Sequence, residues 1–167
     1  GNGEASVRSR LISEEDMVKQ ASEFAGTVPV RHLLPYWKTS NRYLFSGGSV
    51  NMRDAAVYAK EENWSKAVEL WKQTYETKKG KQKMYAAYNT ALGYEMQDSI
   101  DTALEWALKA QTLAREKSKT DKKETGEIHN GTISYYIFIS MYVDELEKRK
   151  EGMARLNMQM NRFDDDF

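Results

Sequence analysis

The sequence has no cysteine, and it contains only two prolines and two histidines among its 167 residues. Without thiols it cannot form disulfides, cysteine-ligated zinc sites or a cysteine nucleophile. The histidines, His32 and His129, lie far apart and belong to no metal-binding or catalytic motif, and no glycine-rich phosphate loop is present. We therefore expect a protein that is not an enzyme, with no catalytic residues, no metal site and no cofactor.

Net charge is also missing, because 25 lysines and arginines balance 25 aspartates and glutamates. A chain without a basic field is not expected to bind nucleic acid. No apolar run approaches the roughly 18–20 residues that span a bilayer, so we expect no direct membrane insertion by these residues. Apolar residues make up 40% of the chain and charged residues 30%, which is typical of one helical domain.

The most informative stretch, residues 88–110, predicts two helices joined by a tight polar turn at residues 97–99. Small residues at Ala91, Ala103 and Ala110 allow two helix backbones to approach closely. Tyr94 and Ile100 fill the space between those helices. This layout resembles the helical hairpin of tetratricopeptide repeats, and the resemblance implies a binding scaffold rather than a reaction.

The stretch at residues 51–78 repeats this pattern without gaps. The equivalent pairs, each 36 positions apart, are Ala55 and Ala91, Tyr58 and Tyr94, Trp64 and Ile100, and Ala67 and Ala103. This spacing is close to the roughly 34-residue tetratricopeptide length. The simplest interpretation is an internal repeat of two helical hairpins.

The expected fold is all-α, with tetratricopeptide-like antiparallel hairpins that form a right-handed α–α superhelix. An N-terminal helix is expected at Glu14–Ala25, followed by an irregular wrap over residues 27–49, where both prolines and two adjacent glycines interrupt any periodicity. A C-terminal helix is expected to cap the array, although residues 132–143 also have the β-branched and aromatic content of a strand. The segments expected within this single domain are the helix and wrap 1–50, hairpin 51–78, hairpin 84–113, polar connector 114–131, capping helix 132–160 and acidic tail 161–167.

In hairpins of this kind the first helices line a concave face, where an extended peptide is expected to bind. Aromatic and arginine side chains usually provide the anchors for such a partner. The candidates on this face are Met52, Arg53, Tyr85, Tyr88, Asn89, Leu92 and Glu95. The alternative, left open by the sequence, is that the wrap at residues 27–49 already fills the groove.

The wrap itself carries a second candidate site, an aromatic rim made of Arg31, Tyr36, Trp37 and Arg42. These residues either bind a ligand or seal the N-terminal end of the helix array. A protein or peptide is the expected partner. Glycan or small-molecule capture is the alternative, because aromatic faces stack on sugar rings.

A wider resemblance is carried by residues spread over Ser13 to Met160. They are Pro35, Arg42, Gly47, Trp64, Ala67, Trp71, Tyr88, Asn89, Glu95, Ala103, Trp106, Tyr142, Leu146, Arg149 and Gln159. In this order they resemble a family of bacterial envelope lipoproteins with C-terminal tetratricopeptide-like helices. The resemblance implies a periplasmic or outer-membrane location, and the start at Gly1 predicts that the chain is the C-terminal part of a longer protein. The function expected from it is a non-catalytic protein-interaction or assembly module.

Overall fold

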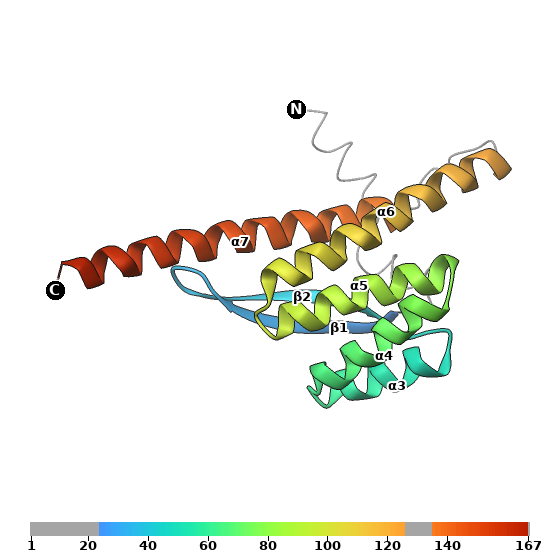
Figure 1. Ribbon diagram of the computed structural model, residues 1–167, viewed down its shortest axis with the longest axis horizontal. Helices are drawn as coiled ribbons and strands as arrows, with labels where there is room; N and C mark the ends of the chain where they lie inside the picture. The colour runs from blue at the N-terminus through green and yellow to red at the C-terminus, as the bar shows by residue number, and fades with distance from the viewer. Residues whose placement is uncertain (1–23, 126–134, 167) are drawn as a thin grey trace.

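The computed structural model describes residues 24–125 and 135–166 (Figure 1). Its elements in chain order are β1 (Phe24–Leu33), β2 (Trp37–Phe45), α3 (Val50–Lys60), α4 (Trp64–Thr77), α5 (Gly80–Met96), α6 (Ile100–Thr125) and α7 (Tyr135–Asp165). Helices dominate as predicted, but the chain also contains a two-stranded sheet, so the all-α class is correct only in outline. None of the helices in these ranges is both long enough and apolar enough to cross a bilayer.

Helices α3 and α4 form one helical hairpin, and α5 and α6 form another (Figure 1). The two turns share one backbone geometry. Glu62 and Asp98 both adopt left-handed backbone conformations, with φ of 60° and 59°. The following amides, those of Asn63 and Ser99, each donate to the carbonyl five residues earlier at 2.9 Å. These turn residues are 36 positions apart, which is the spacing of the predicted internal repeat.

The helices pack closely because small residues lie where they meet. The alanines predicted for these contacts, Ala55, Ala67, Ala91 and Ala103, are fully buried. Gly93 of α5 lies directly against α4, and a Cβ atom there would collide with Val68 and lie 3.2 Å from the Trp71 ring. The spacing of α4 and α5 therefore depends on the absence of a side chain at Gly93.

Residues 24–45 form an antiparallel β-hairpin, not the irregular wrap that the sequence predicted. Val28, Val30 and His32 point toward the interior, whereas Pro29 and Arg31 between them are exposed. This alternation of inward-facing and exposed residues is visible in the sequence, but the two prolines made it hard to recognise as a strand. Proline is tolerated here because both strands of a two-stranded sheet have a free edge.

The predicted N-terminal helix, Glu14–Ala25, is wrong at its C-terminal end, where β1 begins. Phe24 and Ala25 belong to β1, so that helix does not reach Ala25. Its remaining residues, 14–23, lie outside the described part of the chain. The next residue of β1, Gly26, accompanies an irregularity in the strand pairing and has a φ of 103°.

The C-terminal half is more helical than predicted. Helix α6 continues through Thr125 into the expected polar connector, because its lysines and glutamates suit a solvent-exposed helix. Residues 126–134 lie outside the described ranges. Helix α7 settles the ambiguity for residues 135–143 in favour of helix, and it continues through most of the expected acidic tail to Asp165.

Helix α7 packs beside α6 over part of its length and continues past it toward the C-terminus, and the β-hairpin packs on α5 (Figure 1). At the turn of the hairpin Leu34 lies against Gly152 of α7, where an added Cβ would collide with the Leu34 side chain. The hairpin is thereby fixed at both ends, by α5 near Phe45 and by α7 near Leu34. A two-stranded hairpin alone is only marginally stable, so these contacts hold it in place.

Candidate functional site

The residues predicted to line an open concave groove are inside the molecule. Met52, Tyr85, Tyr88, Asn89, Leu92 and Glu95 are buried, and Arg53 alone among the seven candidates is exposed. Phe45, the last residue of β2, stacks on Tyr85 with ring centroids 4.1 Å apart. The open-groove hypothesis is therefore wrong, because the chain's own hairpin occupies the place expected for a partner peptide.

Asn89 fixes the end of β2 through both sides of its amide. The Phe45 amide donates to Asn89 Oδ1 at 3.1 Å, and Asn89 Nδ2 donates to the Phe45 carbonyl at 2.6 Å. Helix α7 encloses the same region, with the hydroxyls of Tyr85 and Tyr135 2.7 Å apart. A buried backbone group without such a partner would be costly. Asn89 thus provides hydrogen bonds to an extended segment, as expected of this face, but the segment is β2.

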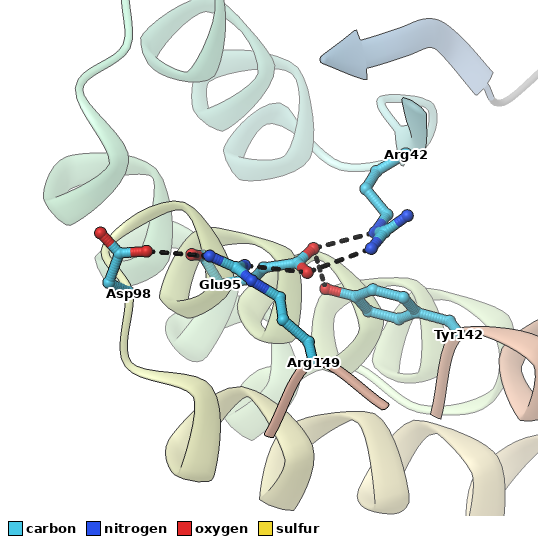
Figure 2. Close-up of polar contacts among 5 residues, drawn as sticks. All are labelled: Arg42, Glu95, Asp98, Tyr142 and Arg149. Atoms are coloured by element: carbon cyan, nitrogen blue, oxygen red, sulfur yellow. Dashed lines mark hydrogen bonds and ion pairs between the residues drawn. The ribbon is translucent and has the colours of Figure 1, made fainter. Parts of the chain in front are cut away.

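An ion-pair cluster joins β2, α5 and the turn after it, and α7 (Figure 2). We define the cluster as Arg42, Glu95, Asp98, Tyr142 and Arg149, which are buried except for Asp98. Arg42 donates from Nε and Nη2 to the two carboxylate oxygens of Glu95, at 2.9 and 3.2 Å. Arg149 Nη1 lies 3.1 Å from Glu95 Oε2, and its Nη2 donates to Asp98 Oδ1 at 2.9 Å. The Tyr142 hydroxyl donates to Glu95 Oε1 at 3.1 Å. One glutamate therefore holds two arginines and a tyrosine from two other elements.

Burial and charge act in opposite directions within this cluster. Burial lowers the pKa of Arg42, but the charge and hydrogen bonds of Glu95 outweigh it, so the net shift is upward. Burial raises the pKa of Tyr142 well above its usual value, and the negative charge of Glu95 adds to the effect. Burial likewise raises the pKa of Tyr88, against the opposing charge of Arg42. Arg42 therefore stays charged, and both tyrosines stay protonated, so that the Tyr142 hydroxyl can donate to Glu95.

The cluster offers no reactive group. Both oxygens of Glu95 accept from at least two donors each, so its carboxylate is occupied as an acceptor. The arrangement connects elements and does not resemble a catalytic pair. Sequence reasoning missed Tyr142 and Arg149 as partners of Glu95. The one available signal was Arg149 itself, a charged residue in line with the apolar positions Ile139, Tyr142 and Leu146 of α7.

Stability is expected to fall as the pH drops below about 6.5, partly because of His32. This side chain is buried in β1, and its Nδ1 has no hydrogen-bond partner in the described structure. Burial lowers its pKa, and the charges of Arg149 and Arg42 lower it further. The unfolded chain therefore takes up the proton first as pH falls, which favours unfolding. The free energy of unfolding measured at pH 7.5 and 5.5 should decrease less in His32→Gln than in the native chain; an equal decrease would contradict this role.

The predicted aromatic rim divides into two places. Arg42 is buried in the ion-pair cluster, whereas Arg31, Tyr36 and Trp37 lie at the hairpin tip, which we define as residues 31–37. Tyr36 is 68% exposed and Trp37 is 60% exposed. The Arg31 guanidinium lies 4.8 Å from the centre of the Trp37 ring, a cation–π contact. Leu33 is also exposed at the tip, so three large apolar side chains meet solvent together.

A cavity of about 240 Å³ lies where the base of the hairpin meets α3, α4 and α5. Its walls are mainly apolar, and Lys60 and Glu62 are its charged members. The volume is below the roughly 300–1,000 Å³ usual for small-molecule sites. Within residues 24–125 and 135–166, no group of three histidine, aspartate or glutamate side chains could hold a metal ion.

In a comparison with known protein families, more than half of the chain matches one family. Residues 53–148 match the family described as domain of unknown function DUF6340, which is more than half of the chain. The chain belongs to this family. Residues 1–45 match a second family, described as domain of unknown function DUF8603. Comparison with curated proteins and with solved structures gave no significant match.

The DUF6340 match begins in α3 and ends in α7, so it covers both helical hairpins and contains Glu95, Asp98 and Tyr142 of the cluster. The DUF8603 match ends at Phe45 and contains Arg42 and the whole β-hairpin. The ion pair between Arg42 and Glu95 and the hydrogen bonds between Phe45 and Asn89 therefore connect the two matched segments. In this chain they form one packed unit.

Proposed function

We propose that this chain is a non-catalytic protein-interaction or assembly module of a bacterial cell-envelope protein, and that the hairpin tip is its recognition element. The observation that carries the proposal is the exposure of Leu33, Tyr36 and Trp37 at a turn whose Leu34 packs against Gly152 of α7. Exposed aromatic residues gathered at one place mark interaction sites, and aromatic and arginine side chains dominate binding energy. The envelope location rests on the sequence resemblance to envelope lipoproteins.

The scaffold behind the tip supports this proposal. We infer that α3–α6 are two tetratricopeptide-like units of a right-handed superhelix, since their turns repeat at 36 residues with the same backbone geometry. In this chain the concave face holds the β-hairpin, so recognition moves to the part of the hairpin that projects from the array. The ion-pair cluster and Leu34 keep the tip preorganised, which lowers the entropy lost on binding.

Glycan capture is a second candidate, favoured by the exposed rings of Tyr36 and Trp37 next to the hydrogen-bond donors of Arg31. The small cavity at the base of the hairpin gives less support to small-molecule capture. The protein partner is preferred because Leu33 adds an aliphatic side chain, which suits a protein surface better than a sugar.

Photo-cross-linking in the producing bacterium tests the proposal. A benzophenone amino acid placed at Trp37 is expected to give a discrete adduct, and the same group at Val57, which is also exposed but lies on α3, is expected to give none. Protease digestion of the adduct distinguishes a protein partner from a polysaccharide. Equal labelling from both positions would contradict recognition by the tip.

For a partner captured in this way, Trp37→Ala should weaken binding by about 30-fold or more, corresponding to about 2 kcal/mol. The ring is mostly exposed, so the free energy of unfolding should change by no more than about 0.5 kcal/mol. Titration calorimetry and urea unfolding of the same variant measure the two quantities. Unchanged affinity in Trp37→Ala would remove the tip from the binding site.

A further inference from the structure

Three lysines from three different helices gather around one group of aromatic rings where α4, α5 and α6 meet. We define this lysine–aromatic patch as Lys72 and Tyr75 of α4, Lys83 and Tyr94 of α5, and Trp106 and Lys109 of α6. Tyr75 packs edge-on against Trp106, with ring centroids 4.9 Å apart. This contact joins the second helices of the two helical hairpins, so the patch extends over both of them.

Each of the three lysines lies against at least one ring. Lys109 Nζ lies 4.0 Å from the centre of the Trp106 ring, which Lys72 Nζ approaches at 5.9 Å. Lys83 Nζ lies 4.6 Å from the centre of the Tyr75 ring, which Lys109 Nζ also approaches at 5.9 Å. These are cation–π distances. Because neighbouring lysines share a ring, the rings hold the three ammonium groups near one another.

The patch lysines have no carboxylate partner within the part of the chain that the structure describes. None of the three forms an ion pair there. Glu76 follows Lys72 by four residues on α4. Glu105 precedes Lys109 by four residues on α6. Ion pairs are common at this helical spacing, but both lysines lie against rings instead.

The chain next to the patch adds positive charge and no negative charge. Residues 77–94 contain four lysines and no aspartate or glutamate. Besides Lys83, these lysines are Lys78, Lys79 and Lys81, and all three are exposed. The whole chain has no net charge, so this is a local concentration of positive charge. Such a concentration attracts anionic groups to this part of the surface.

Burial of the rings distinguishes among the classes of anion. Trp106 is only 7% exposed, and Tyr75 and Tyr94 are half-buried. These rings are therefore not free to stack on nucleobases or to enter the headgroup layer of a membrane. The exposed groups are the ammonium ends of the lysines, which act as point charges. Spaced carboxylates on an extended polypeptide match such a surface.

We propose that the lysine–aromatic patch is a docking surface for an acidic segment of a partner protein, whose aspartate and glutamate side chains pair with Lys72, Lys83 and Lys109. Charge complementarity selects this occupant, because the three ammonium groups lack carboxylates of their own. The inference goes beyond the proposed function, since the hairpin that carries the tip packs on α5 and α3 and the patch is a different surface.

Fluorescence anisotropy with a defined acidic peptide tests the proposal. The probe is a fluorescein-labelled peptide of about ten residues in which glutamate and serine alternate, and the protein is the full chain. We expect saturable binding that weakens as the salt concentration rises from about 50 to 300 mM, because salt screens exposed charges. The same peptide with glutamine in place of glutamate should not bind.

Replacing the patch lysines together, as Lys72→Gln, Lys83→Gln and Lys109→Gln, should raise the dissociation constant of the glutamate peptide by at least about tenfold, since three charge pairs are lost. Tyr75→Leu keeps every charge but removes the ring that two of the lysines share. It should raise the dissociation constant by about two- to fivefold, the size of an exposed cation–π contact.

The matched control makes the same change of charge elsewhere, as Lys38→Gln, Lys60→Gln and Lys148→Gln. These lysines are exposed on β2, α3 and α7. The control should bind the glutamate peptide like the native chain. Trp37→Ala, which tests the hairpin tip, should also leave this binding unchanged, so the two proposals fail independently. Circular dichroism verifies that each variant is folded.

Four outcomes would overturn the proposal. They are absence of binding by the native chain, equal affinity in the native chain and the triple patch variant, an equal loss in the matched control, and tighter binding of another anion through the same lysines. The last is measured with phosphatidylglycerol vesicles and with a single-stranded oligonucleotide. Preference for either over the glutamate peptide would assign the patch to a membrane surface or to nucleic acid.

Discussion

Replacing Glu95 by glutamine is expected to lower the free energy of unfolding by about 3–5 kcal/mol. The substitution keeps the size of the side chain but removes the negative charge between Arg42 and Arg149. All three residues are buried, so both guanidinium groups would remain in a poorly solvated place without their shared counter-ion. Urea unfolding followed by far-UV circular dichroism measures the loss.

Asp98→Asn provides the matched control. Asp98 also pairs with Arg149, at 2.9 Å, but its side chain is 77% exposed, and exposed pairs contribute at most about 1 kcal/mol. A loss in Glu95→Gln no larger than the loss in Asp98→Asn would show that the buried charge is not critical. Replacing Arg42, Glu95 and Arg149 together by Met, Leu and Met should recover much of the stability, because no unpaired charge would remain.

Glu95→Gln should destabilise the β-hairpin more than the helices. Arg42 is the ion-pair partner that β2 contributes, and the hairpin has little stability of its own. Hydrogen exchange in Glu95→Gln is therefore expected to accelerate in β1 and β2 before α3 and α4. This links the cluster to the proposed function, because the hairpin carries the exposed tip.

The helical part of the fold was predictable from local patterns. Small residues such as Ala55 and Ala91 recur at an interval of 36 residues. The turns at Glu62 and Asp98 lie where polar residues separate two apolar stripes. The β-hairpin was not predicted, because Pro29 and Pro35 obscured the alternation of Val28 and Val30. Tertiary packing on α5 decides the structure there, and local propensity does not report it.

The ion-pair cluster was beyond sequence reasoning for a different reason. Arg42 and Arg149 lie 53 and 54 positions from Glu95, so no spacing rule connects them. Arg31 and Arg42 also looked equivalent in the sequence, yet one is exposed at the tip and the other is buried. Their difference depends on which face of the hairpin meets α5, and that face was assigned only by the structure.

The second large effect is expected for Trp71→Ala, which should cost about 3–5 kcal/mol. Trp71 of α4 is fully buried, and its ring lies close to Gly93 of α5, where the two helical units meet. Removing it leaves a cavity that the flanking helices cannot fill without moving apart or distorting their turns. The free energy of unfolding from urea titration measures the cost.

Trp37→Ala is the matched control for Trp71→Ala, because it makes the same chemical change at a ring that is mostly exposed. It should alter the free energy of unfolding by no more than about 0.5 kcal/mol. Trp71→Phe should fall between the two, since a smaller aromatic ring keeps part of the contact with α5. A cost for Trp71→Ala close to that for Trp37→Ala would mean that α4 and α5 do not depend on this contact, and it would weaken the inference that the two hairpins form one continuous superhelix.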